Sequence, residues 1–192
     1  SLYRGNSYYV PPILNEELND LDKNKNPVFD HAEARYFLAF KNGQIVGRIA
    51  AIINLFEINQ QKKPKMRFGW FDVVDDIEVT KALLKKVTEI GRSHGLEYIE
   101  GPVGFSNLDR AGLLTEGFDK IATSITLYNH EYYKTHLETL GFDTASEWVE
   151  NYLSIPEKLP EKVTRLSQII QKKYNLKCIK FKKTSDIEPY IK

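Results

Sequence analysis

Hydrophobic and polar residues alternate in several short runs of the chain, which predicts β-strands. Residues 34–40 and 44–54 form two such runs, separated by Lys-Asn-Gly at 41–43. An Asn-Gly pair supplies the positive φ values that a tight turn needs, so these runs predict a β-hairpin. A third strand is predicted at 66–74, antiparallel to the second.

The pattern then changes to helical spacing and back. Residues 75–95 place apolar side chains on one helical face and end in glycine, a residue favoured just after a helix. A short strand is predicted at 96–104, and strand, helix, strand in that order favours a right-handed crossover between parallel neighbours. A second amphipathic helix is predicted at 130–142, followed by a strand at 147–155.

Further elements are predicted towards both ends of the chain. A short helix is expected at about 13–22, after a Pro-Pro pair. Beyond Pro156, a linker leads to a predicted helix at 163–175 and a strand at 176–183, after which Thr184 and Ser185 are placed to cap another helix. The 192 residues therefore predict one domain at 1–155 and a second, incomplete segment at 156–192.

Composition narrows the classes of partner. The net charge is +1, from 27 basic and 26 acidic residues, so no overall field favours nucleic acid or an anionic membrane. No apolar run approaches the ~18 residues of a membrane span. The single cysteine, Cys178, excludes an internal disulfide and fits a reducing compartment. We therefore expect a cytoplasmic protein without a nucleic-acid or membrane partner.

Metal binding is not expected either. The four histidines have no spacing, to each other or to acids, that is typical of a zinc site: His31, His94, His130 and His136.

The order of elements and two motifs resemble the GCN5-related N-acetyltransferase (GNAT) superfamily over about residues 10–155. The motifs are the hairpin FLAFKNGQIVGRIAAIIN and the helix end YYKTHLETLGF. The resemblance implies an α/β, GNAT-like (acyl-CoA N-acyltransferase) fold, with a mixed central sheet flanked by helices. It also implies acetyl-CoA or another acyl-CoA as cofactor, and a small-molecule or peptide amine as partner.

The resemblance implies where the cofactor binds. Backbone groups at the end of the third strand pair with pantetheine in this family, which assigns Val73 and Val74. A loop of pattern Q/R-x-x-G-x-G/A wraps the pyrophosphate, but the matching positions here are Asp75, Glu78 and Thr80. A carboxylate beside a diphosphate costs on the order of 1 kcal/mol or more near a surface. The resemblance therefore implies a divergent member of the superfamily, which lacks the usual residues of this loop.

Two interpretations of this acidic stretch remain open. It is a good helix start, with Asp76 as N-cap and acids favoured by the helix dipole. Alternatively, the Thr80 hydroxyl, Lys81 and Lys85 hold phosphates while Glu78 points away.

Candidate catalytic residues also follow from the resemblance. The family's tyrosine acid corresponds to Leu137, and Tyr133 lies one helical turn earlier on the same face, beside Tyr132. The alternative for both tyrosines is packing. Glu100, at the end of a strand, and Asp72, in the third strand, are candidate bases for an amine.

A long polar segment, GPVGFSNLDRAGLLTEGFDK, follows the fourth strand. Long irregular loops in compact domains are often functional, although a surface loop with local Asx turns explains the same residues. Candidate substrate contacts in and after it are Asn107, Asp109, Arg110, Tyr128 and Asn129.

Three functions stay open at this point. The first is a divergent acyl-CoA-dependent N-acyltransferase acting on an unknown amine. The second is a catalytically degenerate GNAT-like binding or scaffold domain in a tandem protein, since residues 176–192 have the strand, Thr/Ser, helix order with which such a domain begins. The third is a domain that takes an acylated carrier or an aminoacylated donor.

Overall fold

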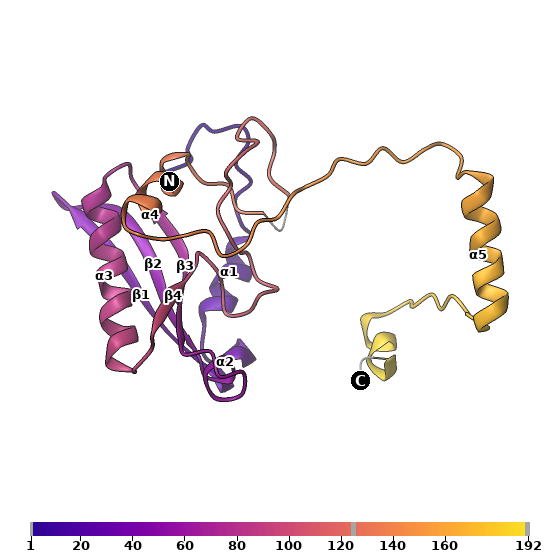
Figure 1. Ribbon diagram of the computed structural model, residues 1–192, viewed down its shortest axis with the longest axis horizontal. Helices are drawn as coiled ribbons and strands as arrows, with labels where there is room; N and C mark the ends of the chain where they lie inside the picture. The colour runs from indigo at the N-terminus through magenta and orange to yellow at the C-terminus, as the bar shows by residue number, and fades with distance from the viewer. Residues whose placement is uncertain (1, 124–125, 191–192) are drawn as a thin grey trace. The chain divides into compact units, whose positions relative to one another are not determined.

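A four-stranded mixed sheet with strand order β1-β2-β3-β4 organises the larger part of the chain (Figure 1). β1, β2 and β3 are antiparallel neighbours, whereas β4 lies parallel to β3. Asn42 and Gly43 have φ values of 51° and 77° in the β1–β2 turn, as the sequence predicts. The strands are β1 (Ala32–Lys41), β2 (Gln44–Asn54), β3 (Lys65–Val73) and β4 (Tyr98–Glu100). The predicted α/β class and mixed sheet are confirmed.

The computed structural model describes residues 2–123 and 126–190. It divides the chain into two units, Ser1–Glu147 and Trp148–Lys192, which are treated separately below. Among the described residues, no helix has the length and apolar character needed to cross a membrane.

β3 contains a bulge at Trp70, where one extra residue changes the direction of every side chain that follows. Arg48 of β2 lies opposite Asp72, but Ala50 lies opposite Gly69, so two residues of β3 face one residue of β2. Trp70 itself has a φ of 45°. Since side chains alternate between faces along a strand, the bulge reverses the alternation at this point.

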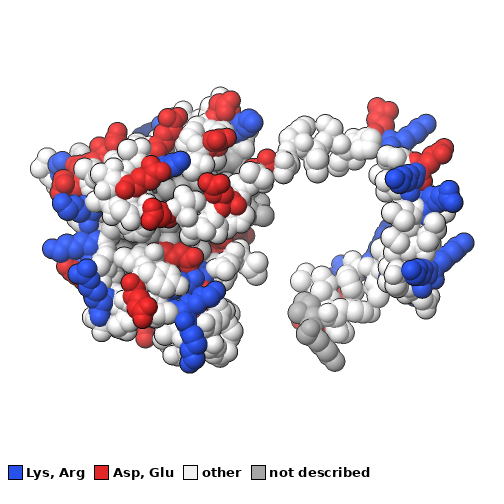
Figure 2. Space-filling view, in the orientation of Figure 1, with Lys and Arg blue, Asp and Glu red and all other residues white. Residues whose placement is uncertain are grey.

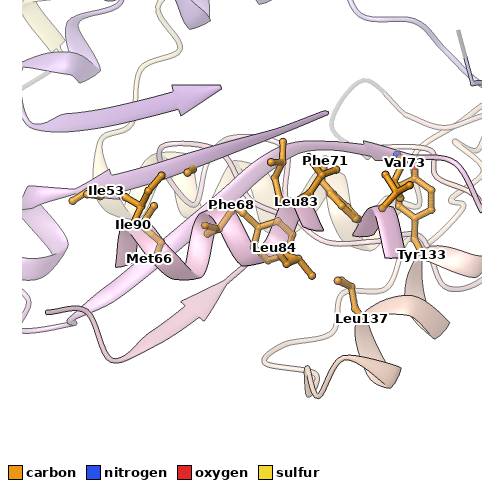
Figure 3. Close-up of a cluster of buried hydrophobic side chains, with 14 residues drawn as sticks. Ile53, Met66, Phe68, Phe71, Val73, Leu83, Leu84, Ile90, Tyr133 and Leu137 are labelled. Atoms are coloured by element: carbon orange, nitrogen blue, oxygen red, sulfur yellow. Dashed lines mark hydrogen bonds between the residues drawn. The ribbon is translucent and has the colours of Figure 1, made fainter. Parts of the chain in front are cut away.

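α3 (Ile77–Ser93) covers one face of the sheet and buries the main apolar core (Figure 3). Gly47 of β2 allows the helix to approach closely, because a Cβ at this position would lie 2.9 Å from Cδ1 of Leu83. Full burial of such apolar side chains stabilises the fold by ~1.5–3 kcal/mol each. The strand residues in this core are Ile49, Ala51, Ile53, Met66, Phe68, Phe71 and Val73.

The opposite face is more polar and is covered by α1 (Leu14–Leu21), η1 (Pro27–Asp30) and the segment after β4. The Tyr36 hydroxyl of β1 donates to the Leu21 carbonyl at 3.2 Å, which ties α1 to this face. α2 (Leu55–Asn59) follows β2 directly. A smaller apolar cluster on this face consists of Ala32, Ala50, Ile52 and Phe105.

α4 (Tyr132–Thr139) lies near the C-terminal end of β3. Its inward face has helical spacing: Tyr133 is 1% exposed, and Leu137, one turn later, is 6% exposed. The helix ends at Gly141, whose φ of 86° suits a glycine after the C-cap. The helices predicted at 13–22, 75–95 and 130–142 are thus confirmed, with slightly shorter bounds.

The second unit contains α5 (Glu161–Tyr174) and the 3₁₀ helix η2 (Thr184–Tyr190). The helix predicted at 163–175 is confirmed. The strands predicted at 147–155 and 176–183 are wrong: neither segment is paired as a strand. Alternating apolar residues form a strand only where a neighbouring strand takes up their backbone hydrogen bonds.

Candidate functional site

An open backbone edge of β3 is the central feature of the candidate site. β4 pairs with β3 only from Lys65 to Arg67, and the Val103 N–H then donates to the Phe68 carbonyl at 2.8 Å, so strand pairing on this side ends before Val73. At its end, the Val73 N–H donates to the Tyr133 hydroxyl at 2.9 Å, and the Val73 carbonyl accepts from the Tyr132 hydroxyl at 2.7 Å. Two tyrosines of α4 therefore take the place of a strand, and Figure 3 shows one of them, Tyr133, beside Val73.

A chain of hydrogen bonds runs from Tyr133 to the other face of the sheet. The Tyr133 and Tyr3 hydroxyls lie 3.0 Å apart, and the Tyr3 hydroxyl donates to Oδ1 of Asp72 at 2.8 Å. Nε of Arg48 donates to the second oxygen, Oδ2, of Asp72 at 2.6 Å. We call Tyr133, Tyr3 and Asp72 the tyrosine–aspartate chain. Only Tyr133 and Asp72 were predicted as candidates from the sequence.

The phenols of this site keep their protons at neutral pH. Burial, and then the negative charge of Asp72, raise the pKa of Tyr3 and of Tyr133 well above the usual range. Burial also raises the pKa of Tyr132 to about 12, with Asp75 and Asp72 adding to the shift. These hydroxyls are therefore proton donors rather than bases.

The start of α3 is closed where the family resemblance implies a phosphate loop. Asp76 is the N-cap and accepts from the Glu78 N–H at 3.0 Å. Thr80 is fully buried, with its hydroxyl 2.9 Å from Nδ1 of His136. Nε2 of the same histidine lies 3.1 Å from Oδ1 of Asp75. The Thr80 hydroxyl thus contacts α4 and is not at the surface.

Val74 has both backbone polar groups in use. Its N–H donates to the Val46 carbonyl at 2.9 Å, and its own carbonyl accepts from the Asp76 N–H at 2.7 Å. The carbonyl of Val73 accepts one bond from a tyrosine and has a second lone pair. A pantetheine chain that paired with Val73 would share or replace the tyrosine contacts.

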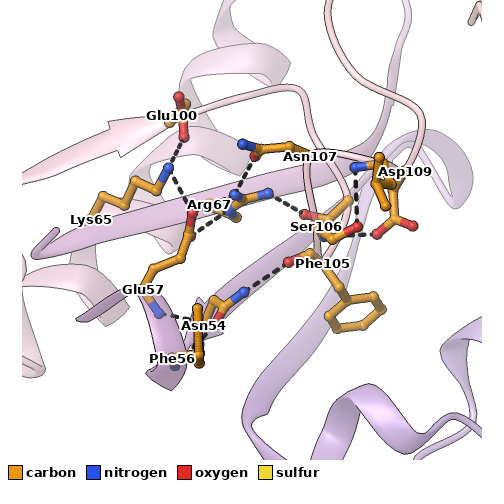
Figure 4. A network of polar contacts seen from close by, with 12 residues as sticks. Asn54, Phe56, Glu57, Lys65, Arg67, Glu100, Phe105, Ser106, Asn107 and Asp109 are labelled. Atoms are coloured by element: carbon orange, nitrogen blue, oxygen red, sulfur yellow. Dashed lines mark hydrogen bonds and ion pairs between the residues drawn. The ribbon is translucent and has the colours of Figure 1, made fainter. Parts of the chain in front are cut away.

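Glu100 belongs to a different cluster, at the other end of β3 (Figure 4). The Lys65 ammonium contacts the Glu100 carboxylate and also lies 3.0 Å from Oε1 of Glu57. Arg67 makes a bidentate contact with Glu57, at 2.7 and 2.6 Å. We call Glu57, Lys65, Arg67 and Glu100 the charge network. It holds Glu100 in an ion pair, away from Tyr133.

The predicted substrate residues do not share one location. Asn107 accepts from Arg67 at 2.6 Å, so it belongs beside the charge network. Asp109 accepts from the Ser106 N–H at 2.8 Å, which is a local turn contact. Asn129 is 3% exposed and accepts from the Leu114 N–H at 2.6 Å, clamping the polar segment.

Tyr128 is the predicted substrate residue that lies near the tyrosine–aspartate chain. Its ring packs edge-on against Tyr3, with centroids 6.1 Å apart. Its hydroxyl donates to the Phe118 carbonyl at 3.2 Å. Among the sequence candidates, Tyr133, Asp72 and Tyr128 are therefore brought together.

Two residues of the site were missed from the sequence. Tyr3 lies in a polar N-terminal stretch without periodicity, and its contacts with Asp72 and Tyr133 span 69 and 130 residues. Arg48 follows Gly47 within β2 and was not singled out by any motif in the sequence. Its pair with Asp72 could nevertheless have been predicted, because opposite charges that face each other on neighbouring antiparallel strands interact.

A separate hollow of about 380 Å³ lies beside η1, on the same sheet face. Asp20 and Asp109 both line it, and burial, followed by the charge of Asp109, raises the pKa of Asp20. The other lining residues are Asn26, Pro27, Val28, His31, Phe105 and Ser106.

Charge elsewhere on the first unit is mixed. On the face shown in Figure 2, acidic and basic side chains are interspersed without a single-sign patch. Within the part of the chain that the structure describes, no group of three or more His, Cys, Asp or Glu residues is placed to hold a metal ion.

Comparison with known proteins gives two curated relatives. The chain is 32% identical over 184 residues to Protein YghO of Escherichia coli, covering 93% of this chain and 46% of that protein. It is 30% identical over 140 residues to the Bacterial ceramide synthase of Caulobacter vibrioides, covering 72% of this chain and 36% of that protein. The chain thus spans less than half the length of either relative.

No protein-family model matches the chain. Among solved structures, the crystal structure of a probable acetyltransferase is similar with a TM-score of 0.41 and 13% sequence identity, covering 78% of this chain and 83% of that one.

Proposed function

We propose that this chain forms part of an acyltransferase, which moves an acyl group from a thioester donor to an amine. The observation that carries the proposal is the tyrosine–aspartate chain at the open edge of β3. Amide formation from a thioester needs a base that takes a proton from the amine and an acid that gives one to the leaving sulfur. We assign the base to Asp72 and the acid to Tyr133, which are joined by hydrogen bonds through Tyr3.

The GNAT resemblance and one relative support the same reaction class. Ceramide is an N-acylated amino alcohol, so the name of the Caulobacter relative describes acyl transfer to an amine. The edge of β3 beyond Phe68, which β4 does not cover, is where the resemblance implies that the pantetheine arm binds. We accordingly place the thioester end of the donor beside Val73 and Tyr133.

The diphosphate end of acyl-CoA fits this chain poorly. The helix start that would meet it carries Asp75 and Glu78, and the Thr80 hydroxyl is buried against His136. Carboxylates at this pole repel an anion that the helix dipole would otherwise attract. We propose that the donor is gripped through its acyl-pantetheine part, as an acyl-CoA or as an acylated carrier.

A second candidate, a non-catalytic GNAT-like binding domain, is favoured by the same occupied groups. Val73 and Val74 have their backbone hydrogen bonds made within the chain, and the phosphate-facing loop has acids in place of glycines. A domain retained only for binding or scaffolding needs neither group to be open.

Donor binding and thiol release separate the two candidates. Thermal unfolding would be followed with acetyl-CoA, a long-chain acyl-CoA and an S-acyl-pantetheine, and thiol release would be measured with a set of primary amines. The acyltransferase proposal expects a higher Tm with the pantetheine thioester and CoA thioester alike. No rise in Tm at millimolar donor, and no thiol release, would instead favour the binding domain.

A matched pair of tyrosine variants tests the acid. Tyr133→Phe is expected to slow transfer by ~10²–10⁴-fold, the usual contribution of a positioned acid. Tyr98→Phe, in β4, removes an exposed hydroxyl and is expected to leave the rate unchanged. Equal rates for the wild-type protein and Tyr133→Phe would exclude this tyrosine as the acid.

A further inference from the structure

The direction of the hydrogen bonds in the tyrosine–aspartate chain is fixed by its chemistry. A carboxylate only accepts, so Tyr3 gives its single hydroxyl proton to Asp72, at 2.8 Å. The contact of 3.0 Å between the two phenols must then be a donation from Tyr133 to Tyr3. Protons therefore lie in one line from the edge of β3 to the carboxylate.

Packing holds the middle member of this line in place. The Tyr3 ring is stacked between Tyr9, at 4.3 Å, and His130, at 5.0 Å, measured between ring centroids. Its side chain is 6% exposed, so little water reaches the hydroxyl. The backbone carbonyl of Leu2 also lies 3.3 Å from Nε2 of His130, which ties the N-terminal segment to the same histidine.

Asp72 is also oriented from its other side. Arg48 donates through Nε to Oδ2 at 2.6 Å and also pairs with Glu17 of α1 at 3.4 Å. This pairing leaves Oδ1 directed at Tyr3. The guanidinium is a charged donor to this carboxylate, and such charge-assisted hydrogen bonds are stronger than neutral ones.

We infer that Tyr3 is a proton relay that joins the base and the acid of the proposed acyl transfer. As the amine nitrogen bonds to the acyl carbon, Asp72 takes a proton from that nitrogen. The transfer runs against the resting direction of these hydrogen bonds, so each hydroxyl first turns its proton the other way. Tyr133 then gives its proton to the leaving sulfur as the carbon–sulfur bond breaks, Tyr3 gives its proton to Tyr133, and Asp72 returns a proton to Tyr3.

The proton balance of this step closes within the chain. One proton leaves nitrogen and one arrives on sulfur, and Asp72, Tyr3 and Tyr133 all end in their starting protonation states. No water or external acid is needed. The relay rests on the proposed acyl transfer, but the coupling between its members exists in the resting protein and is measurable there.

Tyr3→Phe is the direct test during turnover, because it retains the stacked ring and removes only the hydroxyl. If Tyr3 relays the proton, kcat is expected to fall by ~10²-fold or more, because relayed acid–base catalysis is lost. The KM for the donor is expected to change little. The solvent isotope effect on kcat should also change, because several protons move in the step of the wild-type protein and only one moves in the variant. Tyr8→Phe, in the same segment, is the control, with rates compared at a temperature at which all variants are folded.

The second measurement needs no activity. Carbon-13 NMR titration of the Asp72 carboxyl would be recorded for the wild-type protein, Tyr133→Phe, Tyr3→Phe and the double variant. Donation from Tyr133 polarises the Tyr3 hydroxyl and strengthens its bond to the carboxylate. Tyr133→Phe should therefore raise the pKa of Asp72 when Tyr3 is present, and leave it unchanged in the Tyr3→Phe background.

The outcomes distinguish the two levels of the proposal. Equal shifts of the Asp72 pKa in both backgrounds, or an unchanged kcat in Tyr3→Phe, would overturn the relay. A wild-type protein that transfers no acyl group but shows the coupled titration would overturn the proposed function and leave the hydrogen-bonded coupling established.

Discussion

The two ends of β3 carry polar clusters of opposite character. At the first end, the charge network places Lys65 and Arg67, 5% and 1% exposed, against Glu57. At the other end, the tyrosine–aspartate chain consists of neutral hydroxyls and a single carboxylate. The network is closed by mutual ion pairs, whereas the chain ends at a backbone edge that β4 does not cover.

The difference between the two clusters indicates that one end of β3 mainly stabilises the fold and the other end mainly provides groups for chemistry. Buried charges are tolerated only when partners satisfy them. Phenols with raised pKa values are cheaper to bury and keep a transferable proton. We therefore expect changes in the charge network to act mainly on folding, and changes in the tyrosine–aspartate chain to act mainly on transfer.

Arg67→Met should cause the largest loss of stability. It leaves Glu57 buried with Lys65 as its one remaining cation in the network, and removing one partner of a buried ion pair costs about 3–5 kcal/mol. Urea unfolding would measure this loss. Lys86→Met, which breaks an exposed pair with Glu89, is the control and should change stability little. Similar losses for both variants would remove the distinction between the network and the surface.

Tyr133→Phe should cost less, by about 1–3 kcal/mol, because it leaves the Val73 N–H buried without its acceptor. The same unfolding experiment applies. Tyr98→Phe, with its exposed side chain, serves again as the comparison. A loss as large as that of Arg67→Met would show that this end of β3 is equally structural.

Acid should weaken the charge network selectively. Burial alone would raise the pKa of Glu57, but hydrogen bonds from Arg67 and Lys65 outweigh it and hold that pKa below its usual value. The resulting stabilisation is complete above the unfolded-state pKa of about 4.3 and is lost as the pH falls through the lower folded value. Unfolding free energies measured from pH 6 downwards should therefore fall less steeply in Glu57→Gln than in the wild-type protein.

Glu100→Gln should have the smallest effect, on the order of 1 kcal/mol or less, since its side chain is 37% exposed and solvent screens the pair with Lys65. The variant also tests Glu100 as the predicted base. Stability and thiol release would be measured together. A rate that falls by a hundredfold at unchanged stability would assign the base to Glu100 in place of Asp72.

Local signals in the sequence predicted the core of the fold. The Asn-Gly pair determined the hairpin, and the spacing from Val79 to Ile90 determined α3, because both depend on neighbouring residues. The strands predicted at 147–155 and 176–183 failed for the complementary reason. Trp148 and Tyr152 are residue types that favour strands but are 73% and 95% exposed, and a β-favouring composition provides no pairing partner.

The candidate site was predictable only in part. Asp72 and Tyr133 followed from their strand and helix positions, but Tyr3 joins them from a segment with no pattern. Thr80 was open to assignment as a phosphate ligand because its helix position was known and its burial against His136 was not. Contacts between distant segments depend on how the helices pack, and a single sequence contains no record of that packing.

The bulge at Trp70 works as a phase shift along β3. If β3 ran through Trp70 with regular alternation, Trp70 and Asp72 would point into the apolar layer under α3, and the N–H and C=O of Val73 would turn towards β2. The bulge thus lets β3 keep apolar side chains under α3 along its whole length. The Asp72 carboxylate then lies on the opposite face, and the N–H and C=O of Val73 point away from β2. Deletion of Trp70 would consequently remove the bulge and still leave Phe71 and Val73 under α3 and Asp72 on the opposite face, because the later residues would each move back by one position in a regular strand.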